Sequence, residues 1–374
     1  MAKIFISMAG EGRGHAARVR TLVEHLRHDH ELWLFAPNEA YEFLARCYGR
    51  GHDTFNVRLH RIPGLRFHYT NRRLDLAKTI ASGLYYAFRR LPRLVGAFRR
   101  RIDAVSPDLI VTDFEPALGW AAWGRRRVPH LSLDHQHVLM TYDLSSLPRR
   151  LQWHAWSMSW AVRLHTPSPT ARVVSSFYSP PLKAGWNSVK QIGPLIRPEI
   201  AAATPVVGDY ILSYLRSNTP DAVLDMLAGT GVPVKVYGLG ERPSRGALTF
   251  CPIHEIRFVE DLAGCRAVIC AAGNQLLGES LYLGKPVLAL PEEHHHEQMI
   301  NAHFIEQLGV GLWSTLETLT PALIEEFRTG ESRFRENLRP LQGRLDGTPD
   351  ALAEITRLLH GSPAPEFAAS RTIG

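Results

Sequence analysis

This chain of 374 residues has few cysteines and only short apolar runs, and its first half has few acidic residues. Its 4 cysteines are scattered and form no CxxC pair, which argues against a disulfide framework or a cysteine zinc site. Apolar runs stay below the roughly 18–20 residues that span a bilayer, and the N-terminus turns glycine-rich too early for a signal peptide. We therefore expect a cytoplasmic protein.

Charge is divided unevenly along the chain. Residues 1–196 hold 28 Lys and Arg against 14 Asp and Glu, whereas the remainder holds 15 against 22. This split predicts that the first half faces an anionic partner, such as a membrane surface or a phosphorylated acceptor. Arginine enrichment from a GC-rich genome is the alternative. No nucleic-acid recognition motif accompanies the charge, so nucleic acid is not expected as a partner.

The most basic segment is residues 72–101, with 9 Lys and Arg, a single acid and interleaved apolar residues. This amphipathic pattern, which Pro92 is expected to break, favours an element that lies on an anionic membrane surface. Trp153, Trp156 and Trp160 share one helical face by their spacing and suit the same boundary or an acceptor groove. Core helices with solvated rims are the alternative for both segments.

Alternating strand and helix patterns predict an α/β protein with two doubly wound parallel sheets. The first series occupies residues 1–196 and is followed by a Pro- and Ala-rich linker, residues 197–208. The second series occupies residues 209–345 and includes an expected strand over Ile256–Val259. A tail at 361–374 is expected to be weakly ordered.

A glycine loop follows the first predicted strand and leads into a helix that begins near His15. The loop satisfies a dinucleotide fingerprint, but Ala36-Pro37-Asn38 stands where a nicotinamide-binding unit would place an acid. The glycines instead suit a close approach of substrate to the backbone. His15 would then serve as a base for a hydroxyl group, unless it only caps or packs.

Polar residues also end two later strands. Asp113 and Glu115 follow one of them, and Asp134, His135 and His137 follow the next. Ligands of parallel sheets bind at the carboxyl ends of strands. These side chains are therefore candidates to orient His15 or to bind acceptor hydroxyls, or else they satisfy one another at the floor of the site.

The stretch from 262 to 308 is the most informative. A buried strand runs into a turn at Gly273 and then a helix, which lets backbone N–H groups face an anion. Glu279 follows within that helix, where a carboxylate can reach ribose hydroxyls. The next loop is dense in polar groups from His294 to Asn301 and suits a sugar. Consecutive histidines cannot easily share one ion, so no metal is expected there.

These residues resemble the GT-B-fold glycosyltransferases, and in particular glycosyltransferase family 28, whose members include lipid-intermediate N-acetylglucosaminyltransferases. The resemblance is strongest over 269–308, with the AAG turn, Glu279, the GKP turn at 284–286 and the later EQ and NA pairs. It implies two facing Rossmann-like domains with a cleft between them. It also implies that a helix at 349–360 packs back onto the first domain.

The resemblance also implies the roles of individual residues. His15 is similar to the family's proposed base, and we place Asp113 and His137 beside it as the catalytic group. The donor site is expected to include Gly14, Arg216, Ser217, Phe258, Gly273, Asn274, Gln275, Glu279, His295, Glu297 and Gln298. The acceptor is expected to meet Gly12, Glu115, Asp134 and His135. A hydroxyl residue that the family often has after the glycine turn is replaced here by Asn274-Gln275.

The implied reaction is an inverting transfer of a hexose from a nucleotide-sugar, most readily a UDP-sugar, to a hydroxyl of a lipid or lipid-linked acceptor. No cofactor or metal is expected, and the location is cytoplasmic or peripheral on the inner face of the cell membrane. An epimerase similar to UDP-N-acetylglucosamine 2-epimerase is one alternative. A non-catalytic sugar- or lipid-binding protein of the same fold is the other.

Overall fold

The computed structural model describes residues 1–10, 13–49, 54, 56–65, 69–70, 73–74, 82–125, 127–216, 219–292 and 295–361. The predictions made for Gly12, Ser217, His294 and the tail after Gly361 lie outside the described residues, as does most of the basic segment before residue 82. No helix within these ranges combines the length and the apolar character needed to cross a membrane.

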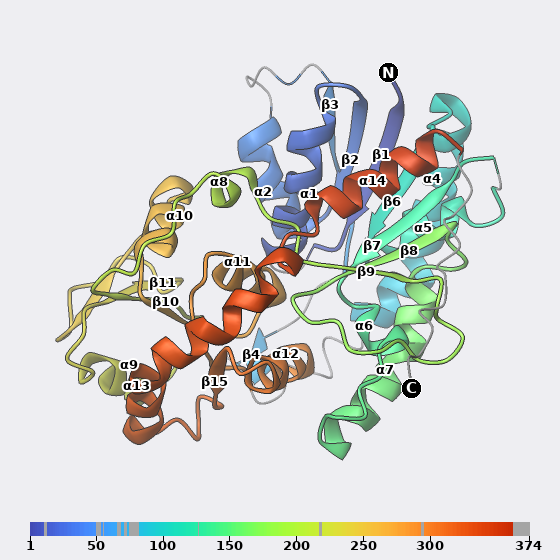
Figure 1. The fold of residues 1–374 in the computed structure, drawn as a ribbon. Coiled ribbons are helices and arrows are strands. Elements are labelled where there is room, and N and C mark those ends of the chain that lie inside the picture. Colours follow the sequence, from blue (N-terminus) through green and yellow to red (C-terminus); the bar gives the residue numbers. More distant parts are fainter. Residues whose placement is uncertain are drawn as a thin grey trace.

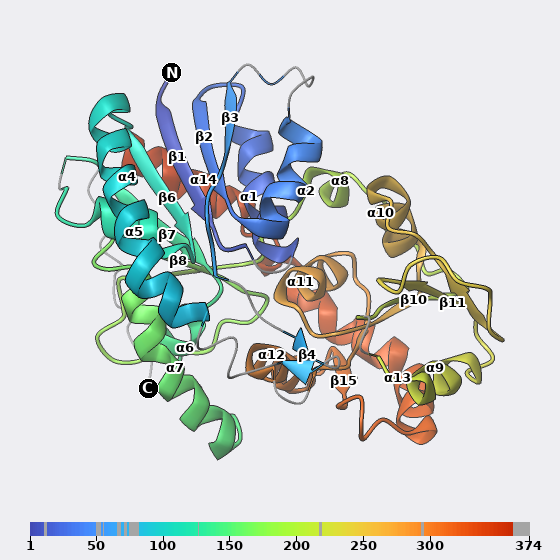
Figure 2. The same cartoon turned by 180° about the vertical axis from the view of Figure 1, so that it is seen from behind.

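Figures 1 and 2 show two lobes, each built on its own sheet. The first sheet has 7 parallel strands in the order β3-β2-β1-β6-β7-β8-β9. Its strands are β1 (Lys3–Met8), β2 (Glu31–Ala36), β3 (Val57–Arg61), β6 (Leu109–Asp113), β7 (His130–Asp134), β8 (Ala171–Ser175) and β9 (Lys190–Ile192). The accompanying helices are α1 (Arg13–Leu26), α2 (Asn38–Tyr48), η1 (Tyr86–Arg90), α4 (Leu91–Val105), α5 (Pro116–Ala122), α6 (Val138–Thr141) and α7 (Arg149–His165). A small pair, β4 (Tyr69–Thr70) and β5 (Arg73–Leu74), is antiparallel.

The second sheet has 6 parallel strands in the order β12-β11-β10-β13-β14-β15. Its strands are β10 (Ile211–Tyr214), β11 (Val234–Tyr237), β12 (Leu248–Phe250), β13 (Ala267–Cys270), β14 (Val287–Ala289) and β15 (Gly311–Trp313). Its helices are α8 (Pro198–Ala201), α9 (Asp221–Ala228), α10 (Glu255–Gly264), α11 (Asn274–Tyr282), α12 (His296–Gln307), α13 (Pro321–Leu338), η2 (Arg339–Arg344) and α14 (Thr348–Leu359). The predicted pair of parallel α/β sheets is confirmed.

The strand order places a switch point in each sheet. In the first sheet, the direction in which successive strands are added to the sheet reverses between β1 and β6. In the second sheet it reverses between β10 and β13. Ligands of such sheets bind outside the carboxyl ends of the strands at this point. The candidate residues Asp113 and Gly273 lie at these two places, directly at the ends of β6 and β13.

Two local predictions are wrong. The segment Ile256–Val259 is part of α10 and not a strand. The His254 side chain accepts a hydrogen bond from the amide of Arg257, which caps the helix. Burial of Phe258, Leu262 and their neighbours follows a helical spacing.

Pro92 also does not break the basic segment. It lies in the first turn of α4, directly after η1, a π-helix, and the helical path continues through it. Proline is tolerated in a first turn because its missing N–H would have no partner there.

The two lobes share apolar packing. One cluster of buried side chains contains Tyr178 and Val174 from the first lobe together with Phe304 and Ala272 from the second. Helix α14 returns from the second lobe to the first, where Ile355 and Leu358 join the core under β1. Figure 1 shows this red helix lying beside α1 and β1.

One glycine allows a close approach between the second lobe and the chain just before the linker. A Cβ on Gly278 of α11 would lie 2.4 Å from Cγ of Pro194, so only glycine fits against the chain that leads into α8. Helix α11 is thereby held against Pro194.

Candidate functional site

The candidate base lies at the first switch point. His15 is in the first turn of α1, and its Nδ1 lies 2.9 Å from Oδ1 of Asp113 at the end of β6. Arg18, one turn further along α1, donates from Nε to Oδ2 and from a terminal nitrogen to Oδ1 of the same carboxylate, at 2.9 and 2.8 Å. The structure therefore brings His15 and Asp113 together as predicted, and adds Arg18.

The surrounding charges keep Asp113 and Arg18 ionised. Burial by itself opposes ionisation of Asp113, but Arg18 and then His15 outweigh it and hold the pKa of that carboxyl below its ordinary value. Burial likewise opposes the charge of Arg18, and Asp113 overcomes it and raises the pKa of the guanidinium. When Nδ1–H of His15 donates to Asp113, Nε2 carries the lone pair of the ring and can accept a proton. The side chain of Gln136 lies 3.4 Å from that Nε2.

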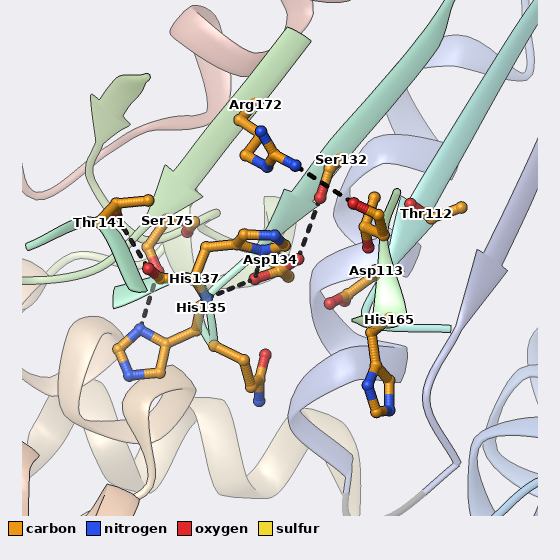
Figure 3. Close-up of polar contacts among 12 residues, drawn as sticks. Thr112, Asp113, Ser132, Asp134, His135, His137, Thr141, His165, Arg172 and Ser175 are labelled. Carbon is orange, nitrogen blue, oxygen red and sulfur yellow. Dashed lines mark hydrogen bonds and ion pairs between the residues drawn. The ribbon is translucent and has the colours of Figure 1, made fainter. Parts of the chain in front are cut away.

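A second histidine and aspartate pair lies at the end of β7. His137 donates its backbone N–H and its Nδ1–H to Asp134, at 2.9 and 2.8 Å to Oδ1. Both side chains are buried, and Nε2 of His137 has no hydrogen-bond partner among the described residues. Burial opposes ionisation of Asp134, but His137 outweighs it and lowers the pKa to about 2. Figure 3 shows this pair beside Ser132, with Asp113 on the neighbouring strand end.

The remaining acceptor candidates have protein partners. Glu115 caps α5, since its two carboxylate oxygens accept from the amides of Ala117 and Leu118. Burial raises its pKa, against those two amides. His135 bonds through Nδ1 to the carbonyl of Ser175 and reaches across to the second lobe, where its Nε2 lies 3.2 Å from Oδ1 of Asn301.

The donor turn lies opposite. After β13 the chain passes through Ala272, which has a positive φ of 24°, to Gly273, the N-cap of α11. The N-terminus of α11 meets that of α1, since a Cβ on Gly14 would lie 3.7 Å from Cβ of Gln275. Two helix N-termini therefore converge on one spot, and their exposed N–H groups and dipoles favour an anion there.

The first residues of α11 keep unused acceptors. The Asn274 amide nitrogen lies 3.4 Å from the carbonyl of Ser175. Gln275 donates to the carbonyl of Leu195 and to Glu279. Within the part of the chain that the structure describes, Oδ1 of Asn274 and Oε1 of Gln275 have no partner. Buried polar atoms normally find hydrogen bonds, so these oxygens suit ligand donors.

Glu279 is paired inside the protein. Arg197, from the linker, donates two hydrogen bonds to its two carboxylate oxygens, at 2.7 and 2.8 Å. Gln275 donates to Oε1 as well. Burial opposes the charge of Arg197, and Glu279 overcomes it and raises the guanidinium pKa. The oxygen Oε2 accepts one of these bonds from Arg197 and so retains acceptor capacity for a further hydroxyl donor.

The polar loop and α12 complete the second half. Gln298 accepts from the amide of Glu292 and is buried, and His295 caps α12 by accepting from the amide of Gln298. Burial opposes ionisation of Glu297, but His135 and then His295 outweigh it and lower its pKa. Arg216 pairs with Glu292 at 3.0 Å.

Phe258 lies in α10, with its ring packed on those of Tyr237 and Tyr214. No group of three or more His, Cys, Asp or Glu side chains among the described residues is arranged to hold a metal ion.

Sequence reasoning missed Arg18, Arg197 and Tyr178 as parts of the site. Arg18 had a readable signal, because it lies three positions after His15 on the same face of one helix. Arg197 and Tyr178 had none, since their partners Glu279 and Asn301 are 82 and 123 residues away.

A family model for glycosyl transferase family 1 matches residues 2–330. The chain belongs to this family. It is 27% identical to an uncharacterized glycosyltransferase of Methanosarcina mazei, over 94% of this chain and 97% of that protein.

Solved structures show the same fold. LpCGTa in complex with UDP aligns with a TM-score of 0.67 and 15% identity, over 96% of this chain and 99% of that chain. MurG of Acinetobacter baumannii aligns with a TM-score of 0.61 and 13% identity, over 96% of this chain and 100% of that chain. The resemblance to GT-B glycosyltransferases is confirmed, with family 1 as the family whose model matches. The protein is a GT-B glycosyltransferase.

Proposed function

We propose that this glycosyltransferase moves a hexose from a UDP-sugar to a hydroxyl of a lipid or lipid-linked acceptor, with inversion and without a metal ion. The observation that carries the proposal is the His15–Asp113 pair at one switch point, 2.9 Å apart, facing the Gly273 turn at the other. UDP is the nucleotide bound in LpCGTa, which shares the fold.

The proposed chemistry is a single displacement. The acceptor oxygen attacks the anomeric carbon as its proton passes to Nε2 of His15, and the bond to the diphosphate breaks. Attack opposite the leaving group inverts the configuration. Asp113 stabilises the imidazolium that forms, since it faces Nδ1. The converging N-termini of α1 and α11 stabilise the leaving diphosphate, the role that a metal ion would otherwise fill.

Replacing the base should separate chemistry from binding. We expect His15→Ala to lower kcat by about 10²–10⁴-fold while UDP affinity stays within about twofold, because the imidazole acts on the acceptor. UDP release from UDP-glucose and UDP-N-acetylglucosamine, with dioleoylglycerol or polyprenol in micelles, measures turnover, and calorimetry measures UDP binding. His25→Ala, later on the same helix, is the matched control. An equal loss of UDP affinity in His15→Ala would remove it as the base.

The lipid acceptor is supported by exposed apolar side chains on α7 and η1 of the first lobe. On α7, Trp153, Trp156 and Trp160 are 68%, 60% and 57% exposed. Phe88 of η1 is 75% exposed and precedes a basic stretch, Arg89, Arg90 and Arg93.

Both elements adjoin the end of β6. The ring of Phe114 stacks on that of His165 of α7 at 4.3 Å. Element η1 runs directly into α4, which packs on α5, the helix that follows β6. Aromatic rings with flanking cations suit a membrane boundary, from which a lipid hydroxyl would enter the site.

Vesicle binding tests the membrane surface. We expect the protein to sediment with vesicles that contain phosphatidylglycerol, and Arg89→Gln, Arg90→Gln, Arg93→Gln together to reduce the bound fraction, since each cation near the surface contributes about 1 kcal/mol. The control changes Arg328, Arg333 and Arg339 of the second lobe to Gln. Equal binding by both triple variants would contradict the membrane surface and leave the transfer reaction to be judged by the His15 experiment.

A further inference from the structure

Asn301 of α12 is fully buried, and its side-chain amide contacts residues of both lobes. Its Nδ2 donates to the carbonyl of Ala272 at 3.0 Å. Its Oδ1 accepts from the hydroxyl of Tyr178 at 3.1 Å and lies 3.2 Å from Nε2 of His135. The orientation of the amide follows from these partners, because a backbone carbonyl can only accept. One side chain therefore joins the donor turn to two residues of the acceptor-side lobe.

The donor-turn contact supports a strained residue. Ala272 has a φ of 24°, which residues with a Cβ rarely adopt, and it directly precedes Gly273. Such a conformation persists only where its surroundings hold it. The hydrogen bond from Asn301 to the Ala272 carbonyl is such a constraint, one residue before the N-cap of α11.

Side chains of the first lobe also interact with α12 one turn before and one turn after Asn301. The ring of Tyr178 stacks on that of Phe304 at 3.8 Å with planes 9° apart, one turn beyond Asn301. Glu297, one turn before Asn301, is close enough to His135 for that histidine to lower its pKa, against the effect of burial. The helix that carries the sugar-contact candidates is thus held by residues that follow β7 and β8 of the first lobe.

We infer that Asn301 is a positioning residue for the transfer reaction: it sets the Gly273 turn relative to the His15 side of the site, with Tyr178 and His135 as its partners across the lobes. The inference rests on the proposed function for what is positioned. The contacts that carry it do not depend on which donor is used.

Hydrogen exchange of the free protein tests the hold on the turn. Asn301→Asp keeps both acceptor contacts and removes the N–H that meets Ala272. We expect amide exchange in peptides covering 270–277 to rise about tenfold, the effect of one lost hydrogen bond, with the rest of the second sheet unchanged. Asn337→Asp is the matched control, because Asn337 of α13 makes a similar but exposed bond to the carbonyl of Gly309. Unchanged exchange at 270–277 in Asn301→Asp would overturn the inference.

Tyr178→Phe keeps the ring stack and removes only the bond across the lobes, so it remains usable if a buried aspartate prevents folding. We expect it to lower kcat about tenfold with UDP affinity within about twofold, whereas Asn301→Asp should weaken UDP binding about tenfold. A purely structural role would lower the melting temperature of both variants without this split, and that result would also overturn the inference.

Failure of the proposed function is distinguishable. A wild-type protein that binds no UDP in calorimetry would contradict the proposed donor. Exchange at 270–277 in the free protein would still decide whether Asn301 holds the turn.

Discussion

Arg18 carries a guanidinium that is only 3% exposed, and Asp113 is the carboxylate that neutralises it. The oxygen Oδ1 of Asp113 is shared, since it also lies 2.9 Å from Nδ1 of His15. One carboxylate therefore has a structural task toward the arginine and a chemical task toward the histidine. The two tasks can be separated by substitution.

We expect Asp113→Asn to lower both stability and turnover. Leaving Arg18 buried without its counter-charge should cost about 3 kcal/mol or more in urea unfolding. Turnover should fall by about 10²–10⁴-fold, because the imidazolium loses its partner. Adding Arg18→Met should restore most of the stability and little of the turnover. A double variant that regains turnover would show that Asp113 acts only through the fold.

Strands β6 and β7 meet at a buried histidine. Nε2 of His130 lies 2.9 Å from the hydroxyl of Thr112, and the backbone N–H of His130 donates to Thr170. Burial, with Arg172 as a smaller cause, lowers the pKa of His130 to about 3. The folded protein thus holds this imidazole neutral.

Because the folded protein holds His130 neutral, this residue makes folding less favourable as the pH falls. Between pH 6.5 and about 3 the unfolded state binds a proton at His130 that the folded state does not, so this part of the stability is present above pH 6.5 and is lost as pH falls. At pH 5 the loss should be about 2 kcal/mol. We expect His130→Gln to lose that part of the pH dependence in urea unfolding between pH 7 and 5. His28→Gln, on an exposed turn, should keep it. An unchanged slope in His130→Gln would mean that the imidazole is already charged in the folded protein.

At the scale of the whole molecule, the last described helix packs on the lobe that holds the first strand. Helix α14 follows the second lobe but buries Ala351, Ile355 and Leu358 in the core of the first. The segments before the linker and before α14 also touch, since the amide of Gly347 donates to the carbonyl of Pro194 at 2.8 Å. The two lobes are therefore joined by two crossings as well as by shared apolar packing.

The variant Ile355→Ala tests how much the packing of α14 on the first lobe stabilises the protein. Removing a fully buried isoleucine side chain should lower the free energy of unfolding by about 2–5 kcal/mol. Thr356→Ala, next to it on the exposed face, should change it by no more than about 0.5 kcal/mol. Urea unfolding followed by tryptophan fluorescence measures both. Equal effects would show that α14 adds little to the first lobe.

The class of fold could be predicted from the sequence because it depends on patterns among neighbouring residues. Strand β1 is apolar on both faces, as a strand in a parallel sheet covered by helices must be, and glycine turns precede α1 and α11. The error at Ile256–Val259 has the same origin. A short apolar run suits a strand or a helix equally, and here the cap at His254 and packing against the second sheet decided for α10.

By itself, the sequence determined the two α/β series, the histidine at the start of α1 and the glycine turn before α11, because hydrophobic period and turn chemistry act over a few neighbouring residues. Only the tertiary structure decided the pairings across long distances. Arg18 meets Asp113 over 95 residues, Arg197 meets Glu279 over 82, and His135 meets Asn301 over 166. The physical reason is that a buried charge or amide forms its hydrogen bonds with whatever partner the fold brings near it. The residues that flank it in the sequence do not identify that partner.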